Sequence, residues 1–448
     1  MYKKLVLALT LALIACNAVL AQTQQSTTTT MSLTLEQAVT YGLENNVDVK
    51  NAAIDEQIAQ STVKEVKSQG LPQINGNINF TDNTKLPVFI FPDPQTGQQT
   101  AFRVGNQFTT AASIDATQLL FDGTFFLGLK AAKDYVELSS LQANRTQIEV
   151  KTNITKAYYL VLITKQNIQL LDSNLISLKK TRDEIKATYE VGLAEELDLD
   201  RLNLSVSQLE LQQKQLQDQY ITALQILKIQ IGLDINTDII LTDDLTLLSN
   251  NFQTDATLLD TVNAANRVEF QMLEQQAELN TLDMRRWKYG YYPTVEAFGT
   301  YNNQSFRDSF NYFNQWAPWY NSSYIGIRIK VPVFDGFYKQ SKIQQARLEL
   351  EKTTNSKDNL ENVIQMEFFQ AKQNYLRAVD MVNIQKKNIE LANKILLTTI
   401  EKQKEGLGSS LDVVNAQDAY RQANIGYLKA LYDLLVAQID LKKATGTI

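Results

Sequence analysis

Four aspartates stand at two repeated positions in this sequence, and the chemistry open to them is that of charge and hydrogen bonding. Asp122 and Asp335 lie in Phe-Asp-Gly triplets that are 213 residues apart. Asp198 and Asp412 each follow a leucine and are 214 residues apart. A carboxylate at a helix start accepts hydrogen bonds from free backbone N–H groups and interacts favourably with the helix dipole. The spacing therefore predicts a duplicated unit, with equivalent helix starts in its two halves.

The side chains that most enzymes and metal sites need are scarce. The chain has no histidine, which is the commonest general base and metal ligand, and its one cysteine is Cys16. We find no nucleophile–base set, no phosphate-binding loop and no metal-ligand spacing. We therefore predict a protein that is not an enzyme and uses no cofactor or metal. The net charge of −6 argues against a nucleic-acid partner.

The N-terminus predicts export. Two lysines precede an apolar run over Leu5–Ile14, which is typical of a signal peptide covering residues 1–21. Cleavage after Ala21 would leave 22–448 as the mature chain, whereas a competing lipoprotein site would leave Cys16 acylated. No later stretch has about 18 consecutive apolar residues, so we expect no membrane-spanning helix.

A second pair of markers repeats at the same offset. A Gly-Leu pair breaks the helical pattern at 192–193 and again at 406–407, 214 residues later. We therefore divide the mature chain into two tandem repeats, 33–232 and 255–446. The segment 233–254 is rich in Asp, Thr and Asn and predicts a connector between them.

Prolines separate the extended parts of the chain from the helical parts. All seven fall within two windows, about 70–123 and 290–336. Because proline costs about 3 kcal/mol in a helix interior, the remaining sequence is free to be helical. There the apolar residues recur with a period near 3.5, which indicates coiled-coil packing. The heptad-like positions are Ile168, Leu171, Leu175 and Leu178; Leu199, Leu202, Val206 and Leu209; and Ile364, Phe368, Ala371, Tyr375, Ala378 and Val382. By themselves these heptads also fit a soluble coiled coil or an ordinary helical bundle.

The predicted helices are of two lengths. Phe125–Val191 and Phe337–Glu405 would each reach about 100 Å. Leu197–Ile231 and Leu33–Ser68 would each reach about 53 Å, so two of them end to end match one long helix. Asp255–Arg286 is the expected counterpart of Leu33–Ser68 in the second half.

The two proline-containing windows predict four strands in two hairpins, at 72–121 and 293–334. Apolar and polar residues alternate along them, as in a transmembrane β-strand of about 9–11 residues. A small soluble sheet packed on the helices would alternate too, but the loops expected at Thr84–Asn106 and Asn302–Asn321 are long, and the second is rich in aromatic residues. Four strands cannot close a barrel, and an open edge is not tolerated in lipid, so the membrane interpretation requires an oligomer.

These features together resemble the TolC-type outer membrane efflux family. The segment Leu33–Ala38, the two Phe-Asp-Gly turns and the two glycine-containing hairpin ends carry the resemblance, in the duplicated order short helix, hairpin, long helix, tip, short helix. The resemblance implies a mainly α fold with transmembrane β, a trimeric α/β-barrel. Each protomer would give four strands to a twelve-strand barrel in the outer membrane and long coiled-coil helices to a periplasmic tunnel.

The resemblance also implies a function and partners. The homotrimer would be a passive exit duct for small molecules or polypeptides in a tripartite efflux or type I secretion system. It would contact outer-membrane lipid, a periplasmic adaptor (membrane fusion) protein and an inner-membrane pump. The alternative from another class is an exported structural coiled-coil scaffold or adhesin, which would have no use for lipid-facing strands.

Adaptor docking is assigned by the resemblance to the hairpin tips. The residues that match are Val191, Gly192, Leu193, Gly406 and Leu407. A glycine at a helix end usually serves only as a cap, but an exposed leucine beside it calls for a partner.

A tunnel gate or selectivity ring is assigned by the resemblance to Asp198, Asp412 and Asn415. Three copies of each aspartate would create a field that favours cations, whereas the local interpretation is stabilisation of a helix start. The family's second acidic position is Asn415 here. Gly408 and Gln403 replace an arginine and a tyrosine that form a latch in one branch, so that latch cannot be carried over.

The Phe-Asp-Gly turns are interpreted as structural. Asp122 and Asp335 are expected to cap helices, and Gly123 and Gly336 to supply backbone freedom where strand becomes helix.

Overall fold

The computed structural model describes residues 31–92, 97–245, 262–312 and 318–448, and within them the chain is mainly helical. The predicted signal peptide and Cys16 lie outside the described residues. The chain forms two compact units, each assembled from three stretches of sequence. The first contains 31–46, 150–245 and 377–436, and the second contains the remaining described residues.

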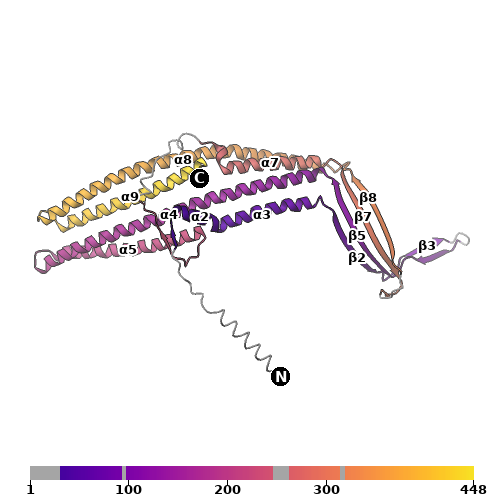
Figure 1. The fold of residues 1–448 in the computed structure, drawn as a ribbon, viewed down its shortest axis with the longest axis horizontal. Coiled ribbons are helices and arrows are strands. Elements are labelled where there is room, and N and C mark those ends of the chain that lie inside the picture. Colours follow the sequence, from indigo (N-terminus) through magenta and orange to yellow (C-terminus); the bar gives the residue numbers. More distant parts are fainter. Residues whose placement is uncertain (1–30, 93–96, 246–261, 313–317) are drawn as a thin grey trace, which may run out of the picture. The chain divides into compact units, whose positions relative to one another are not determined.

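The first unit is built on helical hairpins. Helix α4 (Gly123–Glu190) enters it at Val150 and is followed by α5 (Glu196–Ile231); α8 (Tyr338–Lys404) enters at Arg377 and is followed by α9 (Ser410–Thr445). In Figure 1 each pair runs out to a tight turn and back. A glycine with positive φ lies in each turn, Gly192 in the first and Gly406 in the second. The repeated Gly-Leu pairs of the sequence therefore correspond to the turns of two helical hairpins.

Six of the heptad positions predicted in α4 and α5 form the core of the hairpin of these two helices. Six buried side chains interlock there, three from each helix, and Val414 of α9 packs against them. They are Leu171, Leu175, Leu178, Leu202, Val206 and Leu209. The residues between them on each helix are largely polar and exposed, as expected of a two-helix coiled coil that buries one stripe.

A small β element joins the start of the described chain to the segment after α5. Strand β1 (Met31–Leu33) pairs in parallel with β6 (Ile239–Leu241), and helix α2 (Leu35–Asn45) follows β1 at once. Thr34 and Gln37 form a capping box at the start of α2, with each side chain bonded to the other's backbone N–H.

The predicted helix Leu33–Ser68 is interrupted, which corrects the prediction of one continuous helix. Leu33 belongs to β1, and Asn46 separates α2 from α3 (Val47–Ser68). Asn46 has φ −59° and ψ 136°, outside the helical region. Its side-chain amide donates to the Gln230 carbonyl near the end of α5, at 2.8 Å. A tertiary hydrogen bond thus holds the break, and the heptad pattern cannot reveal it.

The second unit contains a four-stranded antiparallel sheet in the order β2-β5-β7-β8. Its strands are β2 (Gln73–Asp82), β5 (Phe108–Phe121), β7 (Thr294–Arg307) and β8 (Tyr320–Lys330). The β5–β7 pairing joins a strand from each half of the sequence. Within the described residues, β2 and β8 each have one edge without a paired strand.

Two loop predictions are wrong. The segment Thr84–Asn106 contains a second antiparallel hairpin, β3 (Val88–Pro92) and β4 (Gln99–Arg103). The loop predicted at Asn302–Asn321 is shorter, because β7 continues to Arg307. The polar residues at the end of β7 pair through their backbone with β5 and, at 302–304, with β8. Backbone hydrogen bonding does not depend on side-chain polarity, so the polar sequence did not indicate that the strand continues.

A further helix of the second unit, α7 (Val268–Tyr289), begins next to the buried Arg267. Helix α7 follows a 3₁₀ turn (Ala264–Asn266). The predicted continuous helix Asp255–Arg286 is therefore wrong between 262 and 267, and its first residues, 255–261, lie outside the described chain. Arg267, which is buried, joins these parts: its guanidinium contacts Glu269 and Glu367, each at 3.1 Å, and donates to the Ala444 carbonyl.

Across the described parts of the chain, no helix is both long and apolar enough to cross a bilayer.

Candidate functional site

The two hairpin ends of the first unit have the same backbone geometry. At the first, the N–H of Gly192 donates to the Tyr189 carbonyl at 2.8 Å, and the N–H of Leu193 to the Thr188 carbonyl at 2.9 Å. Gly192 has φ +76°. This is the Schellman arrangement, in which a left-handed glycine lets the chain reverse while the last carbonyls of the helix keep partners.

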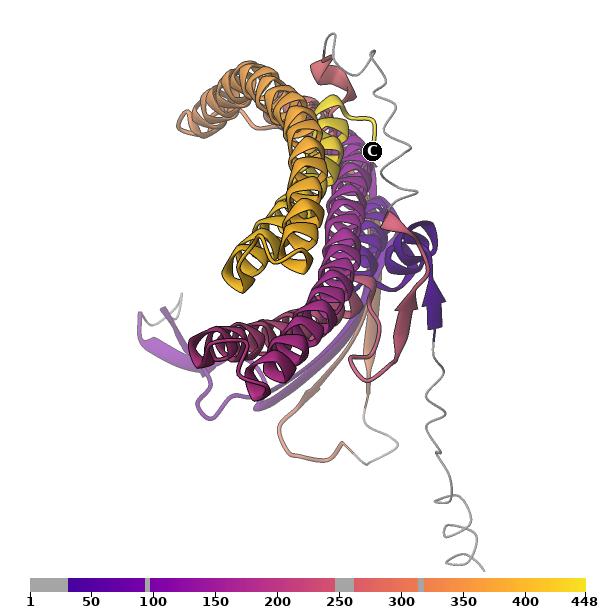
Figure 2. The same ribbon diagram turned by 90° about the vertical axis from the view of Figure 1, so that its left-hand side faces the viewer.

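The second hairpin end repeats this arrangement bond for bond. The N–H groups of Gly406 and Leu407 donate to the carbonyls of Gln403 and Lys402, at 3.0 and 2.8 Å. Gly406 has φ +75°. Gln403 therefore takes part through its backbone carbonyl. Figure 2 looks toward the two ends, one magenta and one orange to yellow.

The leucines beside the glycines are left without the contact that usually accompanies this cap. A residue at this position often packs on the side chains of the last helical turn. Here the residue that would face it is Thr188 at one tip and Lys402 at the other. Leu193 is 80% exposed and Leu407 is 76% exposed, and Val191 is exposed too. The hairpins thus present apolar side chains that their own folding does not use.

The helix starts after the tips differ, although both carry an acidic first turn. Helix α9 is preceded by Ser409, whose hydroxyl accepts from the Asp412 N–H at 3.2 Å. In return the Asp412 carboxylate accepts from the Ser409 N–H at 3.1 Å and from its hydroxyl at 2.8 Å. The hydrogen bonds from Ser409 lower the pKa of Asp412 below its ordinary value. Asp412 is therefore one half of a capping box.

Helix α5 has no such box. Its N-cap residue, Glu195, makes no side-chain cap bond, and Asp198 instead forms an ion pair with Arg201 at 3.6 Å. Asp198 is half-buried, whereas Asp412 and Asn415 are exposed. The two aspartates that share one position in the repeat are thus held by different partners.

Polar contacts connect α9 to the first hairpin. Gln417 donates to the Ser177 hydroxyl at 3.4 Å, and Arg421 donates to the Gln212 side chain at 3.1 Å while pairing with Asp418. A cavity of about 280 Å³ lies beside these residues, and Val414 also lines it. These contacts lie within the first unit and tie its two hairpins together behind the tips.

The strand–helix turns are not equivalent either. Asp122 directly precedes α4 and accepts from the Thr124 N–H and hydroxyl, each at 2.7 Å, as an N-cap residue does. Gly123 has no positive φ, but a side chain there would meet the Tyr289 ring at 2.9 Å. Its absence of a side chain is therefore a packing requirement.

At the second turn two left-handed residues stand between the aspartate and the helix. Gly336 and Phe337 have φ +64° and +66°, and α8 begins only at Tyr338. Asp335 accepts from the Lys339 backbone N–H at 3.2 Å and pairs with its ammonium at 3.0 Å. The prediction of a direct helix cap thus fits Asp122 and is wrong in its detail for Asp335.

The sheet of the second unit has one apolar and one polar face. On the apolar face, the register places Ile74, Ala116, Gly299 and Ile325 in one row across all four strands. Ile325 is 91% exposed, and most large apolar side chains on this face are exposed as well.

The polar face is internally hydrogen-bonded. Asp115 accepts from Asn77 at 3.1 Å, Ser113 at 3.0 Å and Thr300 at 2.8 Å. These side chains come from three different strands, so the bonds tie the strands together on that face.

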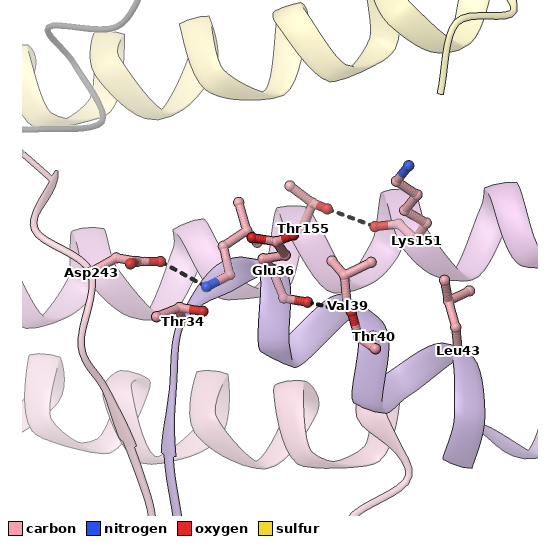
Figure 3. A pocket seen from close by; sticks show the side chains of 9 residues that line it. Thr34, Glu36, Val39, Thr40, Leu43, Lys151, Thr155 and Asp243 are labelled. Atoms are coloured by element: carbon pink, nitrogen blue, oxygen red, sulfur yellow. Dashed lines mark hydrogen bonds between the residues drawn. The ribbon is translucent and has the colours of Figure 1, made fainter.

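The first unit also has a pocket away from its tips, near the start of α2. Its volume is about 690 Å³, and its lining includes Glu36, Lys151 and Asp243 (Figure 3). Asp243 accepts from the Leu35 N–H at 2.7 Å and from the buried Tyr158 hydroxyl at 2.8 Å. Burial, and then Asp243, raise the pKa of Tyr158. Asp243 is thus a structural acceptor that holds β1 and α2 to α4.

The threonine hydroxyls in the same pocket donate hydrogen bonds to backbone carbonyls of their own helices. Thr40 and Thr155 donate to the carbonyls of Glu36 and Lys151, at 2.9 and 2.7 Å (Figure 3). The lining residues form no nucleophile–base pair. In the described residues, no group of three or more acidic or cysteine side chains could hold a metal ion.

Sequence reasoning missed three features of these regions. The capping box at Ser409 could have been found from the Ser-x-x-Asp spacing. The β3–β4 hairpin has a signal in the apolar run Val88–Phe91. The link between Tyr158 and Asp243 joins positions 85 residues apart and leaves no local signal.

Comparisons with known proteins agree on one family. The profile described as "Outer membrane efflux protein" matches residues 41–233 and 263–447. The chain is 19% identical over 410 residues to Outer membrane protein TolC of Vibrio cholerae serotype O1, covering 90% of this chain and 89% of the relative.

Solved structures show the same fold. The outer membrane protein VceC of Vibrio cholerae aligns with a TM-score of 0.70 at 14% identity, covering 92% of this chain and 96% of VceC. The CmeC outer membrane channel of Campylobacter jejuni aligns with a TM-score of 0.73 at 16% identity, covering 92% and 85%.

Proposed function

Because the chain belongs to the outer membrane efflux protein family, we propose that it forms the outer-membrane exit duct of a tripartite efflux or type I secretion system. Copies of the chain, three in the proposed assembly, would join their sheets into one twelve-strand barrel. Their helical hairpins would extend into the periplasm and enclose a passive path for small molecules or polypeptides.

The observation that carries this proposal is the open, two-faced sheet. Its apolar face is exposed in the single chain, as at Ile325, and its polar face is organised around Asp115. A barrel strand in a membrane has this alternation, apolar toward lipid and polar toward the lumen. The unpaired edges of β2 and β8 would cost several kcal/mol per unsatisfied group in lipid, so pairing with further copies follows.

The experiment is purification of the mature chain in detergent, with measurement of the molar mass of the complex and of conductance in a planar bilayer. We expect a trimer that conducts ions. A monomer that stays soluble without detergent and conducts nothing would refute the duct.

We place adaptor docking at the tips formed by Val191, Gly192, Leu193, Gly406 and Leu407. The unused leucines support this, since burying one fully contributes about 1.5–3 kcal/mol. The test is binding of the chain to a periplasmic adaptor by surface plasmon resonance. Leu193→Ser and Leu407→Ser should each weaken binding several-fold. Leu204→Ser, an exposed leucine along α5, is the matched control. Equal binding by all three variants would exclude the tips.

We assign the ion-selective constriction to Asp198, Asp412 and Asn415 in the trimer. Asp412→Ala should weaken block of the channel by multivalent cations, because one ring of charge is lost. Ser409→Ala is the control, since it removes the partner of Asp412 and keeps the charge. Unchanged block and ion selectivity in Asp412→Ala would show that Asp412 does not line the constriction.

A further inference from the structure

The β3–β4 hairpin continues the β2–β5 ladder past a bend. Beyond Asp82, the N–H of Asn83 donates to the Gln107 carbonyl at 2.7 Å, and the N–H of Val104 to the Pro87 carbonyl at 3.1 Å. Strand β3 thus stays on the side of β2, and β4 on the side of β5. Gly105, with φ +109°, lies at the bend. Figure 1 shows the hairpin beyond the end of the sheet.

One face of this hairpin is aromatic and exposed. Phe89 pairs with Phe102 across the hairpin, and Phe91 lies two residues along on the same face. The ring of Phe91 is 6.4 Å from that of Phe89 and 6.3 Å from that of Phe102. Each side chain is at least half exposed. A lone two-stranded hairpin is marginally stable, and an exposed apolar patch on it marks an interaction surface.

The register of the sheet determines what stands next to this hairpin when copies join. Asp82 pairs with Phe108, Phe108 with Arg307, and Gln304 with Tyr320. The end of β2 and the start of β8 therefore lie at the same end of the sheet, on its two free edges. When β2 of one copy pairs antiparallel with β8 of the next, β3 emerges beside the next copy's β8 start.

That neighbouring edge is aromatic as well. Trp319 and Tyr320 are exposed, and the Tyr320 ring lies 6.2 Å from that of Phe306. Aromatic side chains bury large areas and gain further from edge-to-face or offset packing. The two surfaces are thus alike in chemistry and adjacent by register.

We propose that the aromatic face of the β3–β4 hairpin docks on the Trp319–Tyr320 edge of the next copy and clamps the oligomer at the outer end of its sheet. The proposal rests on the assembly given under the proposed function. It assigns the hairpin to a second copy of this chain rather than to lipid.

Disulfide trapping tests the contact directly, because the chain has a single cysteine, Cys16, in the predicted signal peptide. The variant Phe89→Cys with Tyr320→Cys should form reducible interchain dimers and trimers on mild oxidation. Phe89→Cys with Lys330→Cys is the matched control, since Lys330 lies at the opposite end of β8. The parent chain and the single variants show the background.

The outcomes separate the two proposals. A monomer by molar mass refutes the proposed assembly itself. A trimer whose Phe89→Cys/Tyr320→Cys variant cross-links no more than the control overturns the clamp and leaves the duct standing.

A second measurement covers the case of a distorted disulfide geometry. Replacing Phe89, Phe91 and Phe102 by serine should lower the temperature at which the trimer dissociates in SDS. The control replaces Val88 and Ile90, on the opposite face, and should leave it close to that of the parent. Equal dissociation temperatures for all three proteins overturn the clamp. So does strong quenching of a fluorophore on Phe91→Cys by spin-labelled phospholipid, which would place the hairpin in lipid.

Discussion

The capping box at the start of α9 makes the sharpest prediction about the tips, because its matched position in α5 lacks one. Ser409→Ala removes the hydroxyl that accepts from the Asp412 N–H and donates to its carboxylate. We expect the first turn of α9 to open more often. The equivalent change Glu195→Ala removes a side chain that makes no cap bond, so α5 should be unaffected.

The size of the effect follows from the bonds lost. Replacing an N-cap serine by alanine costs about 1 kcal/mol. That energy corresponds to about a fivefold change in a local opening equilibrium. Because the tip turn lies at the end of a hairpin, the cost should appear as local opening near 409–414 and leave the coiled-coil core of α4 and α5 unchanged.

Hydrogen exchange read by mass spectrometry measures this local opening. Peptides covering the start of α9 should lose about fivefold in protection in Ser409→Ala, and peptides covering the start of α5 should keep theirs in Glu195→Ala. If protection at the start of α9 stayed the same, or if both variants changed equally, the box would not stabilise the tip.

The same site predicts a pH dependence of definite sign. The folded pKa of Asp412 is lowered by the hydrogen bonds from Ser409, so it lies below the unfolded value. Its contribution is therefore complete above the unfolded pKa and is lost as the pH falls through the folded pKa. The difference in protection between the parent chain and Asp412→Asn should shrink toward zero in acid and persist at neutral pH.

Four further substitutions test the packing within the two units, each followed by the loss of helical circular dichroism on heating or in urea. Tyr158→Phe removes the hydroxyl bridging the Leu33 carbonyl and Asp243, and should cost about 1–3 kcal/mol, with Tyr159→Phe as the neighbouring control; equal midpoints would show that the bridge adds nothing. Gly192→Ala should cost about 1 kcal/mol for a left-handed backbone in open space. Gly232→Ala should cost clearly more, because its Cβ would lie 2.5 Å from the Asn45 carbonyl oxygen, and similar losses for both would contradict the role of that contact. Arg267→Met leaves Glu269 without its buried partner and should cost about 3 kcal/mol, and a variant as stable as the parent would show that the ion pair only offsets its own desolvation.

Local features of the sequence were enough to predict the long helices and the two reversals. Heptads such as Leu171–Leu178 mark the apolar stripe that a helix buries. The residues of this stripe are three or four positions apart, so a short stretch of sequence is enough to recognise it. Gly192 and Gly406 could be assigned to helix ends because few other residues accept a left-handed backbone. Membership in the efflux family was confirmed by the comparisons. The docking, gating and domain assignments stay predictions.

The sequence by itself therefore determined where the long helices lie and where they reverse, and it predicts that the chain is built from two similar halves. Only the tertiary structure decided that Asn46 breaks a helix, that Asp198 and Asp412 have different partners, and that β5 pairs with β7 to make one sheet from both halves. The physical reason is the distance in sequence between the interacting residues. Periodicity and caps depend on residues a few positions apart, whereas strand partners and buried acceptors are chosen among groups far apart in the chain, and no local pattern records that choice.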